Sequence, residues 1–263
     1  MQSTSILVLP RSPYICAMQL PHDPITPQQH STLSKKIQVA DMFDRIAGRY
    51  DFMNRILSGR IDRQWRKIAL RKLKAKQPKH LLDVATGTAD FALMAHDMLG
   101  PAHITGIDIS VGMLEGGKRK IKARGLETII ELHKGDAETI NAPSDTFDAV
   151  TVAFGVRNFE NLLAGLYEMR RVLKPNGQIL ILEFSTPRNP LIRFLYNMYM
   201  KNIAPALARL LGTDHHAYTY LNRSTNAFPD RENFIDLLKE AGYTTPSFQT
   251  LTFGICCIYT ASK

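Results

Sequence analysis

Apolar and polar positions follow the periods of strands and helices in turn along this chain. Short, mostly apolar runs have the length of buried strands, and apolar residues at helical spacing fill the stretches between them. The strand-like runs are 81–84, 103–109, 129–133, 147–154 and 178–184, and the helical stretches between them are 91–98, 112–124 and 161–173. Because alternating strands and helices build a parallel sheet with helices on both faces, we expect a doubly wound α/β domain.

The segments on either side of this repeat extend the predicted domain. Two helices precede the first strand, and a helix and two closely joined strands follow the fifth. The helices are 39–50, 62–74 and 230–241, and the strands are 247–253 and 254–261. Closely joined strands pair antiparallel. The sequence therefore predicts a mainly parallel seven-stranded sheet that ends in a C-terminal antiparallel hairpin.

Two segments depart from the repeat. Residues 1–36 contain five prolines among Ser, Gln and His, which predicts a disordered tail before a domain at 37–263, with Met18 as an alternative start. Residues 190–226 are apolar, aromatic and basic, with Asp214 as their only acid. We interpret 190–226 as an apolar helical insert that faces substrate or membrane. The alternatives are core packing and a contact between two copies of the chain.

The charge of the chain limits the classes of partner that it is expected to bind. A net charge of +9 predicts a surface that attracts anions. Cations are dense over 60–79, which is either a solvated helix face or a surface for anionic lipid. We find no aromatic–basic stacking motif for nucleic acid, and no His, Cys and acid cluster with the spacing of metal ligands, so we expect neither partner. Three cysteines without disulfide spacing, and no apolar run that spans a bilayer, indicate a cytoplasmic protein.

The first strand-like run leads into a turn of small residues and then into a helical pattern, an arrangement typical of ligand sites in doubly wound domains. Gly87 is the only glycine of this turn, so both G-x-G-x-x-G and the Gly-Lys-Ser/Thr of a phosphate-binding loop are missing. Asp83 and Asp90 on either side would repel a pyrophosphate, whereas a ligand with an ammonium or sulfonium group tolerates them. The turn favours a nucleoside-like ligand that carries positive charge.

Acids at the next strand ends fit such a ligand. Asp108 ends the second strand, where a carboxylate can accept hydrogen bonds from both ribose hydroxyls. Asp136 and Ala137 follow the third strand, where a short polar group can meet an adenine edge. Each acid alone has a loop or capping interpretation. Their succession is more specific, because ligands of open α/β sheets bind at the carboxyl ends of the strands.

This order of features resembles the class I S-adenosylmethionine-dependent methyltransferases, which have a Rossmann-like fold. Within that class, residues 38–263 are similar to the ubiquinone/menaquinone biosynthesis C-methyltransferases. The most specific blocks are Tyr-Asp-Phe-Met-Asn at 50–54 and Phe-Gly-Val-Arg-Asn at 154–158, and further matching blocks are 42–49, 171–177, 182–185 and 218–221. The resemblance implies that S-adenosylmethionine is the co-substrate and that no metal takes part.

The resemblance also implies a cofactor-binding set. Its members are Asp83, Gly87, Thr88, Asp108, Asp136 and Ala137. The chain departs from the family pattern at Ala89, where some members have glycine, and at Ala153, where some members have a contacting serine. An alanine makes no side-chain hydrogen bond, so we leave Ala153 out of the site.

The family reaction methylates a ring carbon of a polyprenylated quinol. Such an enzyme must hold the ring in near-attack geometry and raise its electron density. We predict that Arg157 stabilises the phenolate, with Tyr50 and Asp90 in the catalytic set. The structural alternatives are a salt bridge from Arg157 to Asp90 or Asp51, and a core position for Tyr50. The expected substrate-binding residues are Asn158, Tyr220 and His215.

Three classes of function stay open at this point. The first is methylation of a polyprenyl quinol at the inner face of the membrane, with demethylmenaquinol preferred to 2-methoxy-6-polyprenyl-benzoquinol. The second is a methyltransferase for RNA or a small metabolite. The third is a non-catalytic lipid- or quinone-binding protein that kept the fold. The combination of Thr88, Asp108 and Arg157 favours an enzyme over the third class.

Overall fold

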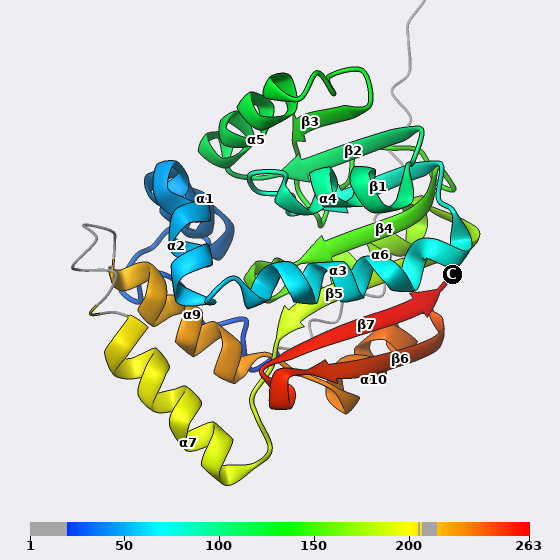
Figure 1. Cartoon of the computed structure of the whole chain (residues 1–263). Coiled ribbons are helices and arrows are strands. Elements are labelled where there is room, and N and C mark those ends of the chain that lie inside the picture. Colours follow the sequence, from blue (N-terminus) through cyan, green and yellow to red (C-terminus); the bar gives the residue numbers. More distant parts are fainter. Residues whose placement is uncertain (1–19, 205, 207–214) are drawn as a thin grey trace, which may run out of the picture.

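The strands follow the order β3-β2-β1-β4-β5-β7-β6 in one sheet of the computed structural model, which describes residues 20–204, 206 and 215–263 (Figure 1). The bounds are β1 His80–Val84, β2 His103–Asp108, β3 Ile130–Lys134, β4 Phe147–Ala153, β5 Leu173–Phe184, β6 Thr244–Leu251 and β7 Cys256–Ser262. Strands β1 to β5 pair in parallel, and β7 pairs antiparallel with β5 and β6. The predicted fold class is confirmed.

Helices connect and flank the strands. Their bounds are α1 Lys35–Ile46, α2 Tyr50–Leu57, α3 Ile61–Leu73, α4 Asp90–Leu99, α5 Val111–Ala123, α6 Leu162–Val172, α7 Pro190–Met198, α9 His215–Ala227 and α10 Glu232–Glu240. The predicted helix 39–50 is divided, because the 3-10 turn Ala47–Arg49 separates α1 from α2. In the insert, a π-helical turn, Tyr199–Ile203, continues α7. No helix in the described ranges is both long and apolar enough to cross a membrane.

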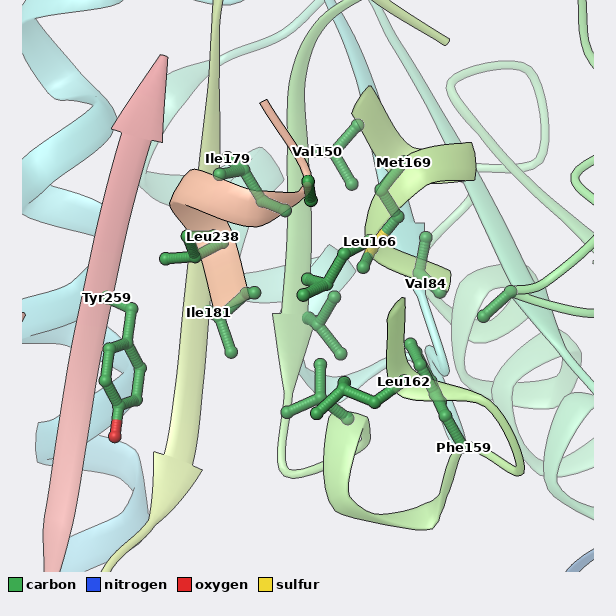
Figure 2. Packing of buried hydrophobic residues seen from close by; sticks show 14 of the residues in the cluster. Val84, Val150, Phe159, Leu162, Leu166, Met169, Ile179, Ile181, Leu238 and Tyr259 are labelled. Atoms are coloured by element: carbon green, nitrogen blue, oxygen red, sulfur yellow. The ribbon is translucent and has the colours of Figure 1, made fainter. Parts of the chain in front are cut away.

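The core lies on both faces of the sheet, as the unbroken apolar runs of parallel strands require. On one face, Leu166 and Met169 of α6 and Leu238 of α10 pack against Ile179 and Ile181 of β5 (Figure 2). Leu180 and Leu182 alternate with these isoleucines and join α3, α4 and α5 on the other face. Burial of each such side chain contributes about 1.5–3 kcal/mol relative to exposure. The sheet is therefore a rigid base for the residues at its edge.

Residues 20–34 correct the predicted tail. They form turns, yet Leu20 is 8% exposed and the His22 side chain is fully buried. Nζ of Lys35, at the start of α1, donates to the carbonyl oxygens of His22 and Arg157 at 3.0 and 3.5 Å. The prediction of disorder is wrong for residues 20–36, because a segment without helical or strand periodicity can still pack through turns. Residues 1–19 lie outside the described range.

The strand order places the ligand site. The chain begins the sheet at β1, builds outward to β3, and returns to add β4 on the other side of β1. Connections that leave in opposite directions from neighbouring strands open a crevice beyond their carboxyl ends. Figure 1 shows α1, α2 and α9 at the end of the sheet toward which these strands point. The crevice thus lies between the strand ends and the helices that flank the repeat.

Candidate active site

Two cavities meet beyond the carboxyl ends of β1 and β4. The first, which we call the strand-end cavity, is open to solvent and borders Gly87, Asp108 and Asp136. The second, the apolar cavity, is the larger of the two and lies among α1, α2, α3 and the insert. Both are lined by Phe43, Tyr50 and Phe154. A ligand in either cavity therefore reaches the same three side chains.

Asp108 is held at the rim of the strand-end cavity by backbone donors. Its two oxygens accept hydrogen bonds from the N–H of Gly87 at 2.8 Å and of Ser110 at 2.9 Å. Gly87 has a φ of 57°, a left-handed conformation that glycine adopts at little cost. Burial raises the pKa of the Asp108 carboxyl to about 6. A carboxylate has about four lone-pair positions, so Asp108 keeps acceptor capacity for a ligand.

Asp136 and Ala137 line the same cavity, as the sequence predicted, and a cation that the sequence analysis missed accompanies them. Nζ of Lys36 lies 2.5 Å from Asp136 and 3.1 Å from Glu138. Burial lowers the pKa of Lys36, but hydrogen bonds to these two acids outweigh burial and raise it. The predicted disordered tail ended at residue 36 and so placed Lys36 outside the domain. The one sequence signal for a role in the site is that Lys36 comes shortly before the helically spaced apolar residues of α1.

The side chains of Asp83 and Thr88 do not line the strand-end cavity. The buried Asp83 carboxylate accepts hydrogen bonds from the hydroxyls of Thr86 at 2.6 Å and Thr151 at 2.7 Å, and burial raises its pKa to about 6. The Thr88 hydroxyl donates to Asp51 at 2.6 Å and accepts from Lys120 at 3.0 Å. Both residues border a smaller side pocket behind the turn. They fix the shape of the turn that carries Gly87.

Ala89 and Ala153, the two departures from the family pattern, occupy tight positions. Ala89 is fully buried at the start of α4 with a φ of 61°. The left-handed conformation costs a residue with a Cβ roughly 1–2 kcal/mol, which the surrounding turn must offset. The absence of a side chain at Gly117 leaves room for Ala89, because a Cβ at position 117 would lie 3.2 Å from the Ala89 Cβ. Ala153 lines the strand-end cavity but has no polar side-chain atom to offer.

Asp90 is paired with Lys120 and not with Arg157. Nζ of Lys120 lies 2.5 Å from Asp90 and 2.5 Å from Asp51, so one cation bridges α4 and α2. Asp90 borders the side pocket but neither the strand-end cavity nor the apolar cavity. The interpretation of Arg157 as a salt-bridge partner of Asp90 or Asp51 is therefore wrong, and the structure gives no support to a catalytic role for Asp90.

Arg157 lines the apolar cavity and is 5% exposed. Its Nη1 lies 2.6 Å from Oε1 of the fully buried Glu183 and donates to the Phe154 carbonyl at 2.6 Å. Its guanidinium lies over the Phe184 ring, 5.4 Å from the centroid. The buried Nε has no hydrogen-bond partner among the described residues. Arg157 is thus fixed by the end of β5 through Nη1.

Tyr50 lies where the cavities join. It lines the strand-end cavity, the apolar cavity and the side pocket, and its ring packs edge-on against Phe43 with centroids 5.9 Å apart. Burial raises the pKa of its hydroxyl, while a hydrogen bond with Asn54 and the nearby Arg66 and Arg157 lower it. Tyr50 is therefore not a pure core aromatic.

Two of the three predicted substrate-binding residues contact each other. The Tyr220 hydroxyl on α9 donates to Oδ1 of Asn158 at 3.1 Å, and both side chains are buried. Asn158 borders the strand-end cavity and Tyr220 the apolar cavity. His215 begins α9, but its side chain is outside the described part of the structure.

Arg66 is a second residue that the sequence analysis missed. The cation-dense helix was interpreted as a solvated or lipid-facing surface, yet Arg66 is 8% exposed and lines the apolar cavity. The helical spacing of Arg66 could have indicated its burial. Asp62, Ala69 and Leu73 lie on the same face of α3 and are also buried. The correction applies to Arg66 alone among the cations singled out on α3, since Arg63, Lys67, Arg71 and Lys72 are exposed.

Comparisons with known proteins agree with this arrangement. The chain is 43% identical to a demethylmenaquinone methyltransferase of Bacteroides fragilis over 94% of this chain and 100% of that protein. It is 42% identical to a ubiquinone/menaquinone biosynthesis C-methyltransferase UbiE of Geotalea daltonii, over 86% of this chain and 96% of that one. A solved S-adenosylmethionine-dependent methyltransferase of Thermotoga maritima shares the fold, with a TM-score of 0.59, 18% identity, and coverage of 85% and 99% of the two chains.

The family model that matches the chain covers nearly all of the described domain. It is that of the ubiE/COQ5 methyltransferase family, and it matches residues 31–263. The match includes both cavities, Lys36 and the insert. The chain therefore belongs to the ubiE/COQ5 methyltransferase family and is an S-adenosylmethionine-dependent methyltransferase.

Proposed function

We propose that the enzyme methylates a ring carbon of demethylmenaquinol, with S-adenosylmethionine in the strand-end cavity and the quinol in the apolar cavity. The observation that carries this proposal is the junction of the two cavities at Phe43, Tyr50 and Phe154. A methyl donor and an acceptor ring that meet there would react without solvent between them. The names of the relatives in Bacteroides fragilis and Deinococcus radiodurans support demethylmenaquinone as the substrate.

The residues of the strand-end cavity fit the proposed co-substrate. Asp108 keeps lone pairs for the two ribose hydroxyls, and Asp136 and Ala137 stand at the next strand end for the adenine edge. Gly87 presents backbone without a side chain. When bound, S-adenosylmethionine supplies an electrophilic methyl group and a neutral thioether as leaving group. The binding residues contribute by orientation, since near-attack geometry lowers the barrier of a two-substrate reaction.

Arg157 is the proposed catalytic residue. Its side chain lines a cavity of low polarity, where a guanidinium strongly favours the ionised form of a phenol. An ionised quinol oxygen, whose proton passes to water, donates electron density to the neighbouring ring carbon. That carbon forms the bond to the methyl group as the carbon–sulfur bond breaks, and it then loses its own proton to water, which restores the aromatic ring. Glu183 holds the guanidinium in place, and the Tyr50 hydroxyl lies at the same junction. Tyr220 lines the apolar cavity, and its hydrogen bond reaches Asn158 at the wall of the strand-end cavity.

The apolar cavity and the insert suit the polyprenyl tail. Trp65, Phe184, Tyr196 and Tyr199 contribute aromatic surface to the cavity. On the outside of α7, Leu191 and Phe194 are each 65% exposed, and Leu195 and Met198 are also exposed. We propose that this exposed face rests on the membrane that contains the quinol, because apolar helix surfaces of this kind insert at the lipid interface.

A second acceptor is 2-methoxy-6-polyprenyl-benzoquinol, which the name of the Geotalea daltonii relative favours. The proposal is tested by incubating the purified enzyme with reduced demethylmenaquinone, the methoxy-benzoquinol, or a small soluble phenol. We expect methylated naphthoquinol to form fastest. Equal or faster methylation of the soluble phenol would contradict a role for the apolar cavity in the choice of substrate.

A further inference from the structure

A second buried arginine lines the cavity that the proposed function assigns to the quinol. Arg66 on α3 is 8% exposed, compared with 5% for Arg157. Its guanidinium lies over the Phe154 ring, 5.2 Å from the centroid, and Phe154 borders both main cavities. None of the roles described above requires a second cation at this position. Its burial therefore needs an explanation.

Arg66 also borders the side pocket, where it lowers the pKa of the buried Asp83 carboxyl, but within the described ranges it has no close ion pair. Its ion pair with Asp62 has an Nε–Oδ2 distance of 3.7 Å, which is too long for a hydrogen bond, and Nε has no other partner among the described residues. The other oxygen of Asp62 accepts from the Ser58 hydroxyl at 2.7 Å. A buried guanidinium whose Nε lacks a hydrogen-bonded acceptor is costly, and an acceptor on a ligand would lower that cost.

The position of Arg66 relative to Arg157 indicates what that acceptor is. The rings of Phe154 and Phe184 are packed with centroids 4.6 Å apart. Arg66 lies on the first ring and Arg157 on the second, at 5.2 and 5.4 Å from the centroids. Two guanidinium groups thus border one apolar cavity. A quinol matches this arrangement, because it has one oxygen at each end of a single ring.

We propose that Arg66 binds the quinol oxygen para to the oxygen that faces Arg157. The inference rests on the proposed function and names a second substrate contact in the same site. Both guanidinium groups lower the pKa of the Tyr50 hydroxyl, and all three side chains line the apolar cavity. With both oxygens held, the ring cannot rotate in its plane, so a single carbon faces the methyl donor. Arg66 would then select quinols over monophenols.

The test combines a change in the enzyme with a change in the substrate. Arg66→Met keeps the apolar stem and removes the charge, and Arg66→Lys retains the charge. Arg63→Met is the matched control, because Arg63 is exposed on the same helix and lines neither the apolar cavity nor the strand-end cavity. Each protein is assayed with reduced demethylmenaquinone and with 3-polyprenyl-1-naphthol, which keeps the oxygen beside the methylated carbon and lacks the para oxygen. The affinity for S-adenosylhomocysteine is measured by calorimetry.

We expect Arg66→Met to lower kcat/KM for the quinol by about tenfold to a hundredfold, the usual effect of losing a hydrogen bond to a charged group. It should change kcat/KM for the monophenol by less than about threefold, since the contact is absent there in the wild type. Arg66→Lys should recover part of the preference for the quinol, and Arg63→Met should resemble the wild type. S-adenosylhomocysteine affinity should stay unchanged in all variants.

Two results would overturn the inference. An equal loss with both acceptors would mean that Arg66 does not contact the para oxygen, and a loss of S-adenosylhomocysteine affinity would place Arg66 in the co-substrate site. If Arg66→Met does not fold, the ratio of kcat/KM for the two substrates in Arg66→Gln decides, because an unchanged ratio after loss of the charge contradicts the contact. Failure of the wild type to methylate either acceptor would instead refute the proposed function.

Discussion

The hydroxyl of Tyr220 donates a 3.1 Å hydrogen bond to Oδ1 of Asn158, and these two side chains line different cavities. The bond joins the loop after β4 to α9 of the insert. It therefore couples the wall of the proposed methyl-donor site to the wall of the proposed quinol site. The contact spans 62 positions of sequence and was not predicted as a pair.

Tyr220→Phe should loosen this junction. Loss of the donor leaves the buried Asn158 oxygen unpartnered, at a cost of about 1–3 kcal/mol in unfolding free energy. We expect a lower Tm and a higher KM for the quinol, with S-adenosylhomocysteine affinity nearly unchanged. Tyr167→Phe is the control, because the Tyr167 hydroxyl also donates a hydrogen bond but lies on the exposed face of α6. If both variants lose the same unfolding free energy and the same activity, the Tyr220–Asn158 hydrogen bond contributes no more than an exposed hydrogen bond.

Variants of the buried Arg157–Glu183 ion pair should show its effect on stability separately from its effect on catalysis. Arg157→Met leaves the fully buried Glu183 without its cation, so we expect a loss of about 3–5 kcal/mol in unfolding free energy, together with a drop in kcat of about a hundredfold or more. The double variant Arg157→Met, Glu183→Gln should recover much of the stability and none of the activity. Recovery of kcat in the double variant would show that Arg157 acts only as a counter-ion.

Lys36 should contribute to co-substrate affinity. It bridges α1 to Asp136 and Glu138 at the rim of the strand-end cavity. Lys36→Met should raise the Kd for S-adenosylhomocysteine about threefold to tenfold, because an unpaired Asp136 no longer holds its position against α1. Lys118→Met removes a cation of an exposed pair with Glu115 and should leave the Kd unchanged. Calorimetry of the two variants side by side would measure the difference.

The pKa of Asp108 predicts how co-substrate binding depends on pH. Burial raises it from 3.8 to about 6, so below pH 6 a growing fraction of the carboxyl is protonated and accepts fewer hydrogen bonds. The Kd for S-adenosylhomocysteine should rise by up to about tenfold for each pH unit below 6. Asp108→Asn should bind weakly at every pH with a flat profile. A wild-type Kd that is constant from pH 7 to pH 5 would remove the Asp108 carboxylate from the binding site.

The same shift acts on stability with the opposite sign. Between pH 3.8 and about 6, the folded protein binds a proton at Asp108 that the unfolded chain does not. The unfolding free energy that this group contributes is therefore present at low pH and is lost as the pH rises through 6. Cofactor affinity and this contribution to stability should change in opposite directions over the same range.

The exposed apolar face of α7 should bind lipid. Leu191→Ser with Phe194→Ser removes the two most exposed side chains of this face, and we expect the double variant to float less with vesicles of anionic lipid. Val111→Ser is the control, because Val111 is also exposed but belongs to α5, at the other end of the molecule (Figure 1). Equal flotation of wild type and double variant would contradict the membrane contact.

Local pattern was sufficient for the fold and for part of the site. Strand and helix periods predicted the sheet and its C-terminal hairpin, and the strand ends identified Gly87, Asp108 and Asp136. Ion pairs between distant segments were not predictable in this way. The Lys36–Asp136 and Arg157–Glu183 pairs join residues 100 and 26 positions apart, and no local spacing marks them. Asp90 was misplaced for the same reason, because its partner Lys120 lies on another helix.

The central claim is tested most directly by following the methyl group. The purified enzyme would be incubated with reduced demethylmenaquinone and S-adenosylmethionine that carries a deuterated methyl group, and the quinone would be analysed by mass spectrometry. The account predicts menaquinone with the intact deuterated methyl group on its ring carbon, and almost none with Arg157→Met. Unlabelled quinone from the wild-type enzyme, or label on a ring oxygen instead of carbon, would contradict it.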